Sequence, residues 1–446
     1  MLLSIGGFYR RGDGGETILR TSATDGMPKR CAAIRQQAVN WGTHCVRRGP
    51  GAHRLLMASP PDPTQRVILT LGLAACASVL AGRALDPLVA DIGAEFGAAA
   101  ATVALLGSAY ALPYALVQPV LGPVGDAIGK RRVIRACLVL LALTLLVSAA
   151  APDLLSLSIL RVLSGAAAGG VFPLAIALIG DLVPIEKRQV ALSRLLVAGL
   201  TGSAAGGLLA IFVAPVFGWR SVLLVCAAAT LAAVVSMRGR DQVPPGSRPN
   251  LPEALARYRG ILGLRAARIL YAAVFVEGAL VFGVFPFIAP LLIERGLGGT
   301  AEAGFALAGF AAGGFLFGAL APWLLRRFGQ SGVVAIGGGM ASLGLAGLAL
   351  LPVVTALAAT CLLLGLGFYM IHSAIQTRVT ELVPQARGSA VALHAFCFFL
   401  GQSLGPVLLG LGWGLIGPGP SLLVAAAGML ALSLWLAAPG GGKAPR

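Results

Sequence analysis

Charged side chains are scarce in this chain. Only 11% of its 446 residues are Asp, Glu, Lys or Arg, whereas soluble globular domains contain about 25%. This composition excludes a single large soluble fold. Apolar residues make up 57% of the chain and form uncharged runs that recur from about residue 67. A membrane helix needs about 20 such residues, so the runs predict an all-α, polytopic membrane protein.

The usual sequence signatures of catalysis are also absent. The chain has no GxxxxGK[ST] phosphate-binding loop and no constellation typical of a catalytic site, so we expect no enzyme activity. Four N-terminal residues have side chains that can bind metals but match no zinc spacing: Cys31, His44, Cys45 and His53. We therefore expect no metal and no cofactor. None of the seven cysteines falls in a loop assigned to the outside, so we expect no disulfides.

The apolar runs predict twelve membrane spans. Their approximate limits are 67–90, 101–122, 133–151, 155–178, 190–213, 219–237, 267–290, 303–325, 332–351, 355–377, 389–411 and 420–438. The polar, Gly- and Arg-rich segment before them predicts a disordered extension, unless translation starts at Met57. The expected domains are this extension (1–66), two six-helix bundles (67–237 and 267–438), a cytoplasmic linker (238–266) and a cytoplasmic tail (439–446).

Cations collect on one side of the predicted spans. Twenty Lys and Arg residues fall in the loops and tail of that side, whereas only Arg220 and Arg295 fall in loops of the other. Positively charged loops stay in the cytoplasm, so both termini are predicted to be cytoplasmic. The expected location is the plasma membrane, which in a bacterium is the inner membrane. The net charge of +17 then reflects topology, and we expect no nucleic-acid partner.

The sequence also repeats itself. Residues 181–188 read DLVPIEKR, and residues 381–388 read ELVPQARG. Each stretch follows a span that ends on the cation-rich side. The repeat predicts two pseudo-symmetric six-helix bundles in the same orientation, which is one known architecture of secondary transporters.

A basic stretch between the second and third spans, GPVGDAIGKRR, has a degenerate copy in the second half, GALAPWLLRRFG. If Lys130 is aligned with Arg326, Pro322 stands where the first copy has Asp126. On this alignment the second copy keeps the cations and loses the acid.

These features resemble the major facilitator superfamily over about residues 67–438. The residues that match the family's motif between helices 2 and 3 are Gly122, Gly125, Asp126, Gly129, Lys130 and Arg131. Those that resemble its fourth-helix motif are Arg161, Gly165 and Gly169. The residues that resemble the fifth-helix motif of proton-driven exporters are Gly202, Gly206 and Gly207. A related pattern in helix 11 consists of Gly401, Gly405 and Pro406. Ser203 stands where the fifth-helix motif has Pro. The resemblance implies the fold of twelve-helix drug or metabolite:proton antiporters, with close helix packing at these glycines.

Asp126 is the first candidate site residue. The resemblance implies that this carboxylate and the glycines and cations around it form a conformational latch, which holds the halves together on the cytoplasmic side when the transporter faces outward. A carboxylate there can pair with a cation or a helix N-terminus. The alternative is a solvated turn that only enforces topology.

Arg161 lies inside the fourth span, about 10 Å below the outer surface at 1.5 Å per residue. A cation at that depth is costly unless it is paired. Asp86 is the acid nearest in depth, so we expect an Arg161–Asp86 ion pair in the central cavity, with Arg83 competing for it or completing it. The alternative is that Asp86 caps the outer end of the first span while Arg83 reaches the interface.

Glu277 lies near the middle of the seventh span, deeper than any other acid of the second half. A buried carboxylate that gains and loses a proton is a candidate coupling site, and a neutral packing residue is the alternative. Tyr271 shares a helix face with Phe275 and Phe282. This face is a candidate lining of an apolar pocket, and lipid contact or packing is the alternative. His372 and His394 are candidate proton relays in the cavity, with packing as the alternative. The candidate cavity donors are Gln118, Gln376 and Gln402.

The expected function is proton-coupled export of a small organic molecule by alternating access. Proton-coupled uptake and a transport-inactive membrane sensor or scaffold are the alternatives. The expected partners are the small-molecule substrate and the lipid bilayer, with the monomer as the working unit. The proton gradient is the expected energy source.

Overall fold

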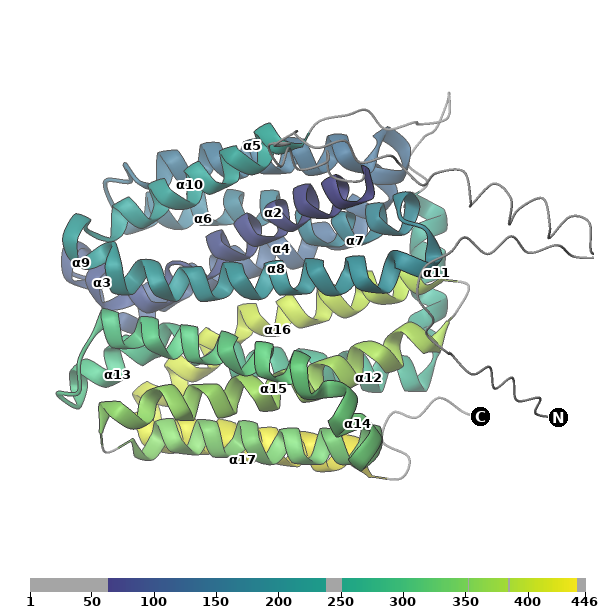
Figure 1. Cartoon of the computed structure of the whole chain (residues 1–446). Coiled ribbons are helices and arrows are strands. Elements are labelled where there is room, and N and C mark those ends of the chain that lie inside the picture. The colour runs from purple at the N-terminus through teal and green to yellow at the C-terminus, as the bar shows by residue number, and fades with distance from the viewer. Residues whose placement is uncertain (1–62, 238–250, 352, 384–385, 439–446) are drawn as a thin grey trace, which may run out of the picture. The chain divides into compact units, whose positions relative to one another are not determined.

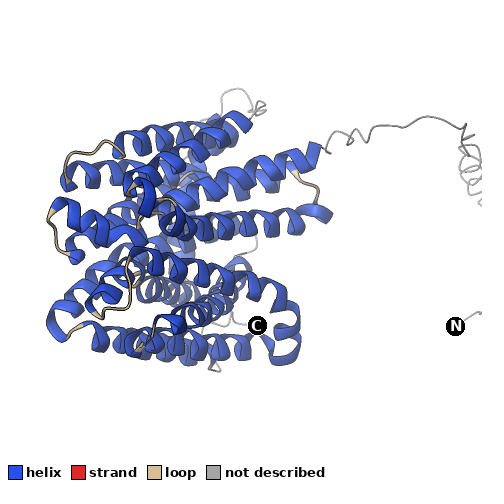
Figure 2. Cartoon of the chain, turned by 60° about the vertical axis from the view of Figure 1, so that its left-hand side comes forward, coloured by secondary structure: helices blue, strands red, loops and turns tan. Residues whose placement is uncertain are grey.

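The structure is a computed structural model that describes residues 63–237, 251–351, 353–383 and 386–438. All of these belong to the compact unit formed by residues 61–446. The regular structure of this described part is entirely helical (Figure 2). Several segments with sequence predictions lie outside the described residues. They are most of the expected extension, which includes Met57 and the candidate metal ligands Cys31, His44, Cys45 and His53, together with the first part of the linker and the tail.

Twelve membrane-length segments are present in the described part of the chain. Ten helical segments are long and apolar enough to cross a membrane. One of them, α14 (Thr300–Leu350), has 51 residues and contains the non-helical residue Gly329, so it holds two spans. A further span is α5 (Lys130–Ser148), which begins with the three cations KRR. These cations distinguish α5 from the ten more apolar segments. The predicted twelve-span fold is confirmed.

The first half forms the spans predicted over residues 67–237. Its elements are α2 (Pro63–Arg83), η1 (Asp86–Leu88), α3 (Val89–Phe96), α4 (Ala100–Ile128), α5, α6 (Leu154–Ala168), α7 (Val171–Leu182), α8 (Ile185–Phe212), α9 (Ala214–Phe217) and α10 (Trp219–Ser236). The first span consists of α2, η1 and α3 in line, and the fourth consists of α6 and α7. Helix α2 begins four residues before the expected limit, at Pro63, a residue favoured in the first turn of a helix.

The second half repeats this order. Its elements are α12 (Arg265–Phe282), η2 (Phe285–Phe287), α13 (Ile288–Glu294), α14, η3 (Val354–Ala356), α15 (Leu357–Leu382), α16 (Arg387–Ile416) and α17 (Pro418–Ala437). In Figure 1, α2–α10 occupy the upper part of the helical unit and α12–α17 the lower part. Helix α4 packs against α16, and α8 packs against α14, and these contacts join the halves.

Helix α11 (Leu251–Gly263) lies inside the segment expected to be a polar linker. Its buried side chains are Ala254, Tyr258 and Ile261, which recur at helical spacing and form one face. The Tyr258 hydroxyl donates a hydrogen bond to the carbonyl of Pro119 in α4 (3.2 Å). The sequence pattern did not reveal this helix because its charged residues obscure the short apolar period.

Close helix contacts repeat between the halves. A Cβ on Gly165 would overlap the carbonyl oxygen of Tyr110, and a Cβ on Gly365 would overlap that of Phe310. Each residue of the second pair follows its counterpart by 200 positions. Both glycines therefore let two helices approach until their backbones touch.

Gly129 and Gly329 repeat at the same interval. Both have positive φ, 103° and 65°, which glycine adopts more easily than other residues. Each joins two consecutive spans, so this register aligns Asp126 with Arg326. The expected alignment of Lys130 with Arg326 is therefore wrong by four positions, because a short run of cations does not fix a helical register.

Candidate functional site

A cavity of about 600 Å³ lies between the two halves. From the first half, residues of α2, η1, α4, α7 and α8 line it. From the second half, residues of α12, η2, α14, α15 and α16 line it. Both bundles therefore contribute side chains to the cavity wall.

The cavity is exposed toward one end of the bundle. We refer to the end that carries Lys130 and Arg326, near α11 in Figure 1, as the basic end. Lining residues far from the basic end, such as Asp86 and Pro286, are buried, whereas Leu196, which is nearer to it, is 47% exposed.

At the opposite end the two halves pack closely. A Cβ on Gly410 of α16 would lie 3.6 Å from the Cβ of Ala101 in α4. A Cβ on Gly207 of α8 would overlap the carbonyl oxygen of Gly304 in α14. The short helices η1 and η2 also contact each other. These contacts close the opposite end, so the cavity opens toward the basic end.

Aromatic rings dominate the cavity wall. Eleven Phe and Tyr residues line it. Four of them, which we refer to as the aromatic cluster, are Phe282, Phe310, Phe368 and Phe398. Their contacting rings have centroids 5.1 to 6.1 Å apart, a favourable range for aromatic pairs. Of the three aromatic residues predicted to share one face of the seventh span, Phe282 is the one that lines the cavity.

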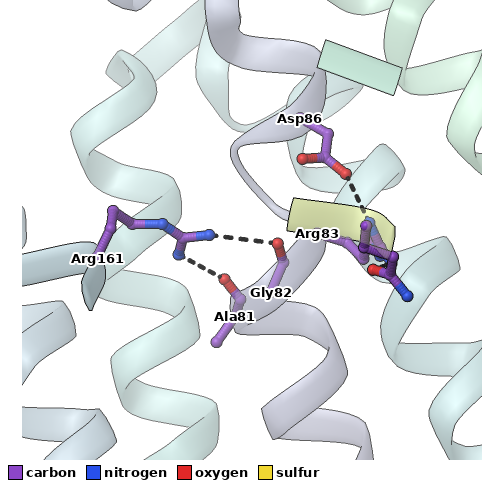
Figure 3. Close-up of polar contacts among 6 residues, drawn as sticks. Ala81, Gly82, Arg83, Asp86 and Arg161 are labelled. Atoms are coloured by element: carbon purple, nitrogen blue, oxygen red, sulfur yellow. Dashed lines mark hydrogen bonds and ion pairs between the residues drawn. The ribbon is translucent and has the colours of Figure 1, made fainter. Parts of the chain in front are cut away.

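Arg83 brings a positive charge to the cavity wall (Figure 3). Its Nη1 lies 3.4 Å from Oδ2 of Asp86, and its Nη2 donates a hydrogen bond to the side-chain oxygen of Gln402. The guanidinium carbon also lies 4.0 Å from the centroid of the Phe282 ring. Asp86 belongs to the first half, whereas Gln402 and Phe282 belong to the second, so Arg83 connects the halves.

Arg161 is buried at the end of α2, with 1% of its surface exposed. Its guanidinium donates hydrogen bonds to the carbonyls of Ala81 (2.9 Å) and Gly82 (3.3 Å), as Figure 3 shows. These carbonyls lie in the last turn of α2, where a helix leaves its C=O groups without intrahelical partners. The guanidinium carbon also lies 4.2 Å from the centroid of the Tyr110 ring. Arg161 thus caps the C-terminal end of α2, where the first span is interrupted before η1.

The expected ion pair between Arg161 and Asp86 does not form. Asp86 pairs with Arg83, three positions earlier, and Arg161 is directed to the main chain of α2 (Figure 3). The reason is the end of α2, which offers carbonyl acceptors closer to Arg161 than the carboxylate is. The two charges still interact electrostatically over the longer distance.

Glu277 lies behind the cavity wall with no exposed surface. Its Oε2 is 2.9 Å from Nδ1 of His372, and the His372 side chain lines the cavity. The ring of His394 follows, with its centroid 5.0 Å from that of His372. We refer to these three residues, from α12, α15 and α16, as the acid–histidine cluster. The structure thus brings together three residues that the sequence predicted separately.

The other polar candidates divide between the cavity and the helix contacts. Gln376 and Gln402 line the cavity. Gln118 donates its Nε2 hydrogen to a carbonyl between α6 and α7 (3.1 Å), and the Tyr271 hydroxyl donates to a carbonyl of α16 (3.2 Å). Both are buried and lie outside the described cavity lining. Both join neighbouring helices. Packing was the alternative for Tyr271, whereas the prediction that Gln118 is a cavity donor is wrong, because its amide is directed to the carbonyl of Gly169.

The glycines of the fifth and eleventh spans lie at helix crossings. A Cβ on Gly202 would overlap the carbonyl oxygen of Cys76 in α2, and a Cβ on Gly401 would overlap that of Phe275 in α12. The remaining residues of the two patterns also contact neighbouring helices: Gly206, Gly207, Gly405 and Pro406. These contacts bring α8 close to α2 and α14, and α16 close to α12 and α4.

At the basic end, Lys130 bridges two carboxylates. Its Nζ lies 2.7 Å from Oδ1 of Asp126 and 2.8 Å from Oδ2 of Asp181. Partial burial lowers the pKa of the Lys130 ammonium, but hydrogen bonds and charges from the two aspartates outweigh burial and hold its pKa above the ordinary value. Asp181 was not predicted to take part, although it opens the repeated stretch DLVPIEKR. All three residues belong to the first half.

The rest of the basic stretch surrounds this bridge. A Cβ on Gly125 would lie 2.9 Å from Cδ2 of Leu174 in α7, whereas a Cβ on Gly122 would meet nothing within 4 Å. Gly129 forms the turn before α5, and Arg131 lies in the first turn of that helix. In this conformation the stretch therefore packs α4 against α7 within one half.

A sequence profile described as Major Facilitator Superfamily matches residues 71–406. The uncharacterized MFS-type transporter YwfA of Bacillus subtilis (strain 168) is 24% identical over 347 residues, which cover 77% of this chain and 84% of YwfA. The 4-hydroxybenzoate transporter PcaK of Pseudomonas aeruginosa is 25% identical over 337 residues, 66% of this chain and 74% of PcaK. A multidrug resistance protein B homolog of Mycobacterium tuberculosis is 30% identical over 201 residues, 43% of this chain and 37% of that protein. The chain spans 58% of a further relative, YfhI of Bacillus subtilis.

Solved structures show the same fold. The nucleoside transporter NupG has a TM-score of 0.68 at 17% identity, over 82% of this chain and 98% of NupG. The human organic anion transporter MFSD10 has a TM-score of 0.65 at 19% identity, over 85% of this chain and all of MFSD10. The described chain shares with this fold its twelve spans in two repeated halves. Because the sequence profile also matches well over half of its length, the chain belongs to the Major Facilitator Superfamily of membrane transporters.

Proposed function

We propose that this transporter couples the export of a small organic molecule to proton entry. The acid–histidine cluster is the observation that carries the proposal. A carboxylate in the membrane interior is costly when it is charged and unpaired, and a hydrogen bond between Glu277 Oε2 and His372 Nδ1 requires a proton between them. Because His372 lines the cavity, this proton can exchange with water in the cavity as access alternates.

Export is proposed from the orientation of the cavity and from the fifth-helix resemblance. The cavity opens toward the basic end, and the distribution of Lys and Arg assigns that end to the cytoplasm. A cytoplasmic solute would then reach the site directly in this conformation. The location we propose is the plasma membrane, or the inner membrane of a bacterium, with both termini inside. Because one chain lines the cavity, we propose the monomer as the working unit.

Proton-coupled uptake is the second candidate. A proton site beside the cavity serves symport as well as antiport. The names of the relatives do not distinguish the two, since one is a multidrug resistance protein B homolog and another a 4-hydroxybenzoate transporter. The retained charges in the cavity wall favour either of these functions over a transport-inactive sensor.

Reconstitution in liposomes separates the two directions. The full-length protein is inserted into liposomes, and candidate solutes are added outside under an imposed pH gradient. Antiport predicts accumulation when the lumen is acidic, because protons leave as solute enters. Accumulation only when the exterior is acidic would establish symport and contradict proton-driven export.

Glu277→Gln tests the coupling site. The amide cannot release a proton, so proton-driven accumulation should fall to the level of protein-free liposomes. The matched control is Glu294→Gln at the exposed end of α13, which should transport at the normal rate. If Glu277→Gln still builds a solute gradient, the acid is not the coupling site.

A further inference from the structure

The side chains that line the cavity indicate which class of substrate it binds. Its accessible, half-buried rings include Phe172, Tyr369, Phe398 and Phe399. The rings of Tyr114 and Phe399, from opposite halves, have centroids 3.8 Å apart. Rings placed in this way bind flat apolar groups through stacked and edge contacts. The cavity wall therefore favours a planar aromatic group.

Arg83 provides the polar contact for such a group. A guanidinium has five N–H donors, and the side-chain contacts with Asp86 and Gln402 use two of them. The Arg83 side chain is 17% exposed and lines the cavity, so donors remain for a bound molecule. The planar fork of a guanidinium matches a carboxylate, which it binds through two parallel hydrogen bonds.

The acids are poorly placed to receive a cation. Asp86 is 5% exposed and already pairs with Arg83. Glu277 has no exposed surface and lies behind His372. In addition, the cations of the basic end raise the local concentration of anions near the opening of the cavity. An anionic ligand is therefore favoured over a cationic one.

We infer that the cavity binds an aromatic carboxylate, with its ring against Phe398, the half-buried member of the aromatic cluster, and its carboxylate on Arg83. Phe282 links the two contacts, because its ring centroid lies 4.0 Å from the Arg83 guanidinium carbon and 5.5 Å from the centroid of Phe398. A ring that packs on Phe398 thus lies within reach of the guanidinium for its carboxylate substituent. This inference rests on the proposed transport function and names its substrate class.

Equilibrium binding to the full-length protein in detergent tests the inference. Three probes share one ring and differ in charge: 2-naphthoate, 2-naphthamide and 2-naphthylmethylammonium, all followed by naphthalene fluorescence. The affinity for the carboxylate should be at least about tenfold higher than that for the amide, because charged hydrogen bonds are stronger than neutral ones. Equal affinities for carboxylate and amide, or the tightest binding for the ammonium, would overturn the inference.

Arg83→Gln should lower the affinity for 2-naphthoate to that for 2-naphthamide, and Arg83→Lys should give an intermediate value. Arg259→Gln, an exposed arginine of α11, is the matched control and should bind 2-naphthoate normally. Size-exclusion chromatography and thermal unfolding verify that each variant is folded. Unchanged 2-naphthoate binding by folded Arg83→Gln would contradict the assignment of the carboxylate to Arg83.

Phe398→Leu tests the ring contact without removing the charge. It should weaken the binding of 2-naphthoate and 2-naphthamide by the same factor and leave their ratio unchanged. Normal binding of both probes by this variant would contradict the aromatic contact. The variant also provides a test if Arg83→Gln does not fold.

Failure of this inference can be distinguished from failure of the proposed function, because the binding experiment uses no gradient. Arg83-dependent binding of 2-naphthoate without proton-driven flux would contradict the transport proposal and leave this inference in place. Proton-driven flux of a cationic solute that does not compete with 2-naphthoate would contradict this inference alone.

Discussion

Ionisable side chains inside the helical bundle have different kinds of partner. Arg161 uses the free carbonyls at the end of α2, whereas Arg83 uses a carboxylate, an amide oxygen and a ring. Glu277 uses a histidine. Opposite charge alone therefore does not identify the partner of a buried residue, because main-chain acceptors compete with side chains wherever a helix ends.

A double-mutant cycle distinguishes the partners of Asp86. Alanine substitutions of Arg83 and Asp86 should be coupled by about 0.5–3 kcal/mol in unfolding free energy, the range for residues in contact. Arg161 and Asp86 should be coupled less, since they share no hydrogen bond. Unfolding of the single and double variants in detergent provides the measurement. Stronger coupling of Asp86 to Arg161 than to Arg83 would contradict the contacts drawn in Figure 3.

Asp126→Asn separates a latch from a structural ion pair. The Asp126 side chain is 66% exposed, and Lys130 has a second carboxylate partner, Asp181, at 2.8 Å. Exposed ion pairs contribute about 0–1 kcal/mol, so membrane insertion and thermal stability should change little. If Asp126 latches the halves in another conformation, transport should fall severalfold. Normal transport by Asp126→Asn would remove the latch role.

At the scale of the helix, glycine determines how closely two elements approach. The crossing of α12 and α16 depends on Gly401, whose missing side chain leaves room for the carbonyl of Phe275. The crossing of α2 and α8 depends in the same way on Gly202. These glycines act on packing between helices and not on the flexibility of either helix.

Gly401→Ala should therefore destabilise the protein. The added methyl group forces α12 and α16 apart, and overpacking of this kind typically costs about 1–3 kcal/mol. The control is Gly339→Ala in α14, where an added Cβ meets nothing within 4 Å. That change should be neutral or stabilising by up to about 1 kcal/mol. Thermal unfolding of the purified variants provides the comparison, and equal midpoints would contradict the packing role of Gly401.

The sequence predicted the spans well because length and apolarity specify a membrane helix. It did not specify which face of a span meets the cavity, because a helix that is apolar all round has no amphipathic period. Gln402 and Gln118 are equally polar residues in apolar spans, yet Gln402 lines the cavity and Gln118 joins two helices. The same limitation applies to Tyr271, which packs behind the wall.

At the scale of the whole molecule, the two halves pack closely at the end opposite the basic end, and the cavity between them is open at the basic end. Alternating access requires the closed contacts to separate. The close approach of Gly410 to Ala101 should then be temporary, although it is tight in this conformation.

A reversible cross-link tests this requirement. In a variant whose seven native cysteines are replaced by serine, cysteines are introduced by Ala101→Cys and Gly410→Cys. The Cβ separation of 3.6 Å lies within the range for disulfides, about 3.5–4.5 Å. Oxidation should stop transport, and reduction should restore it, while solute binding from the basic end continues. Each single-cysteine variant is the control, and full transport by the cross-linked protein would contradict the required separation.

The contact between Arg83 and Phe282 has a geometric consequence. The repeat that relates Pro87 of η1 to Pro286 of η2 also relates Arg83 to Phe282. Equivalent residues of two parallel halves can touch only near the axis that relates those halves, which runs along the membrane normal. The guanidinium therefore lies close to this axis, where side chains of both halves can reach it. A molecule held there would contact both halves at once, so one arginine can serve both.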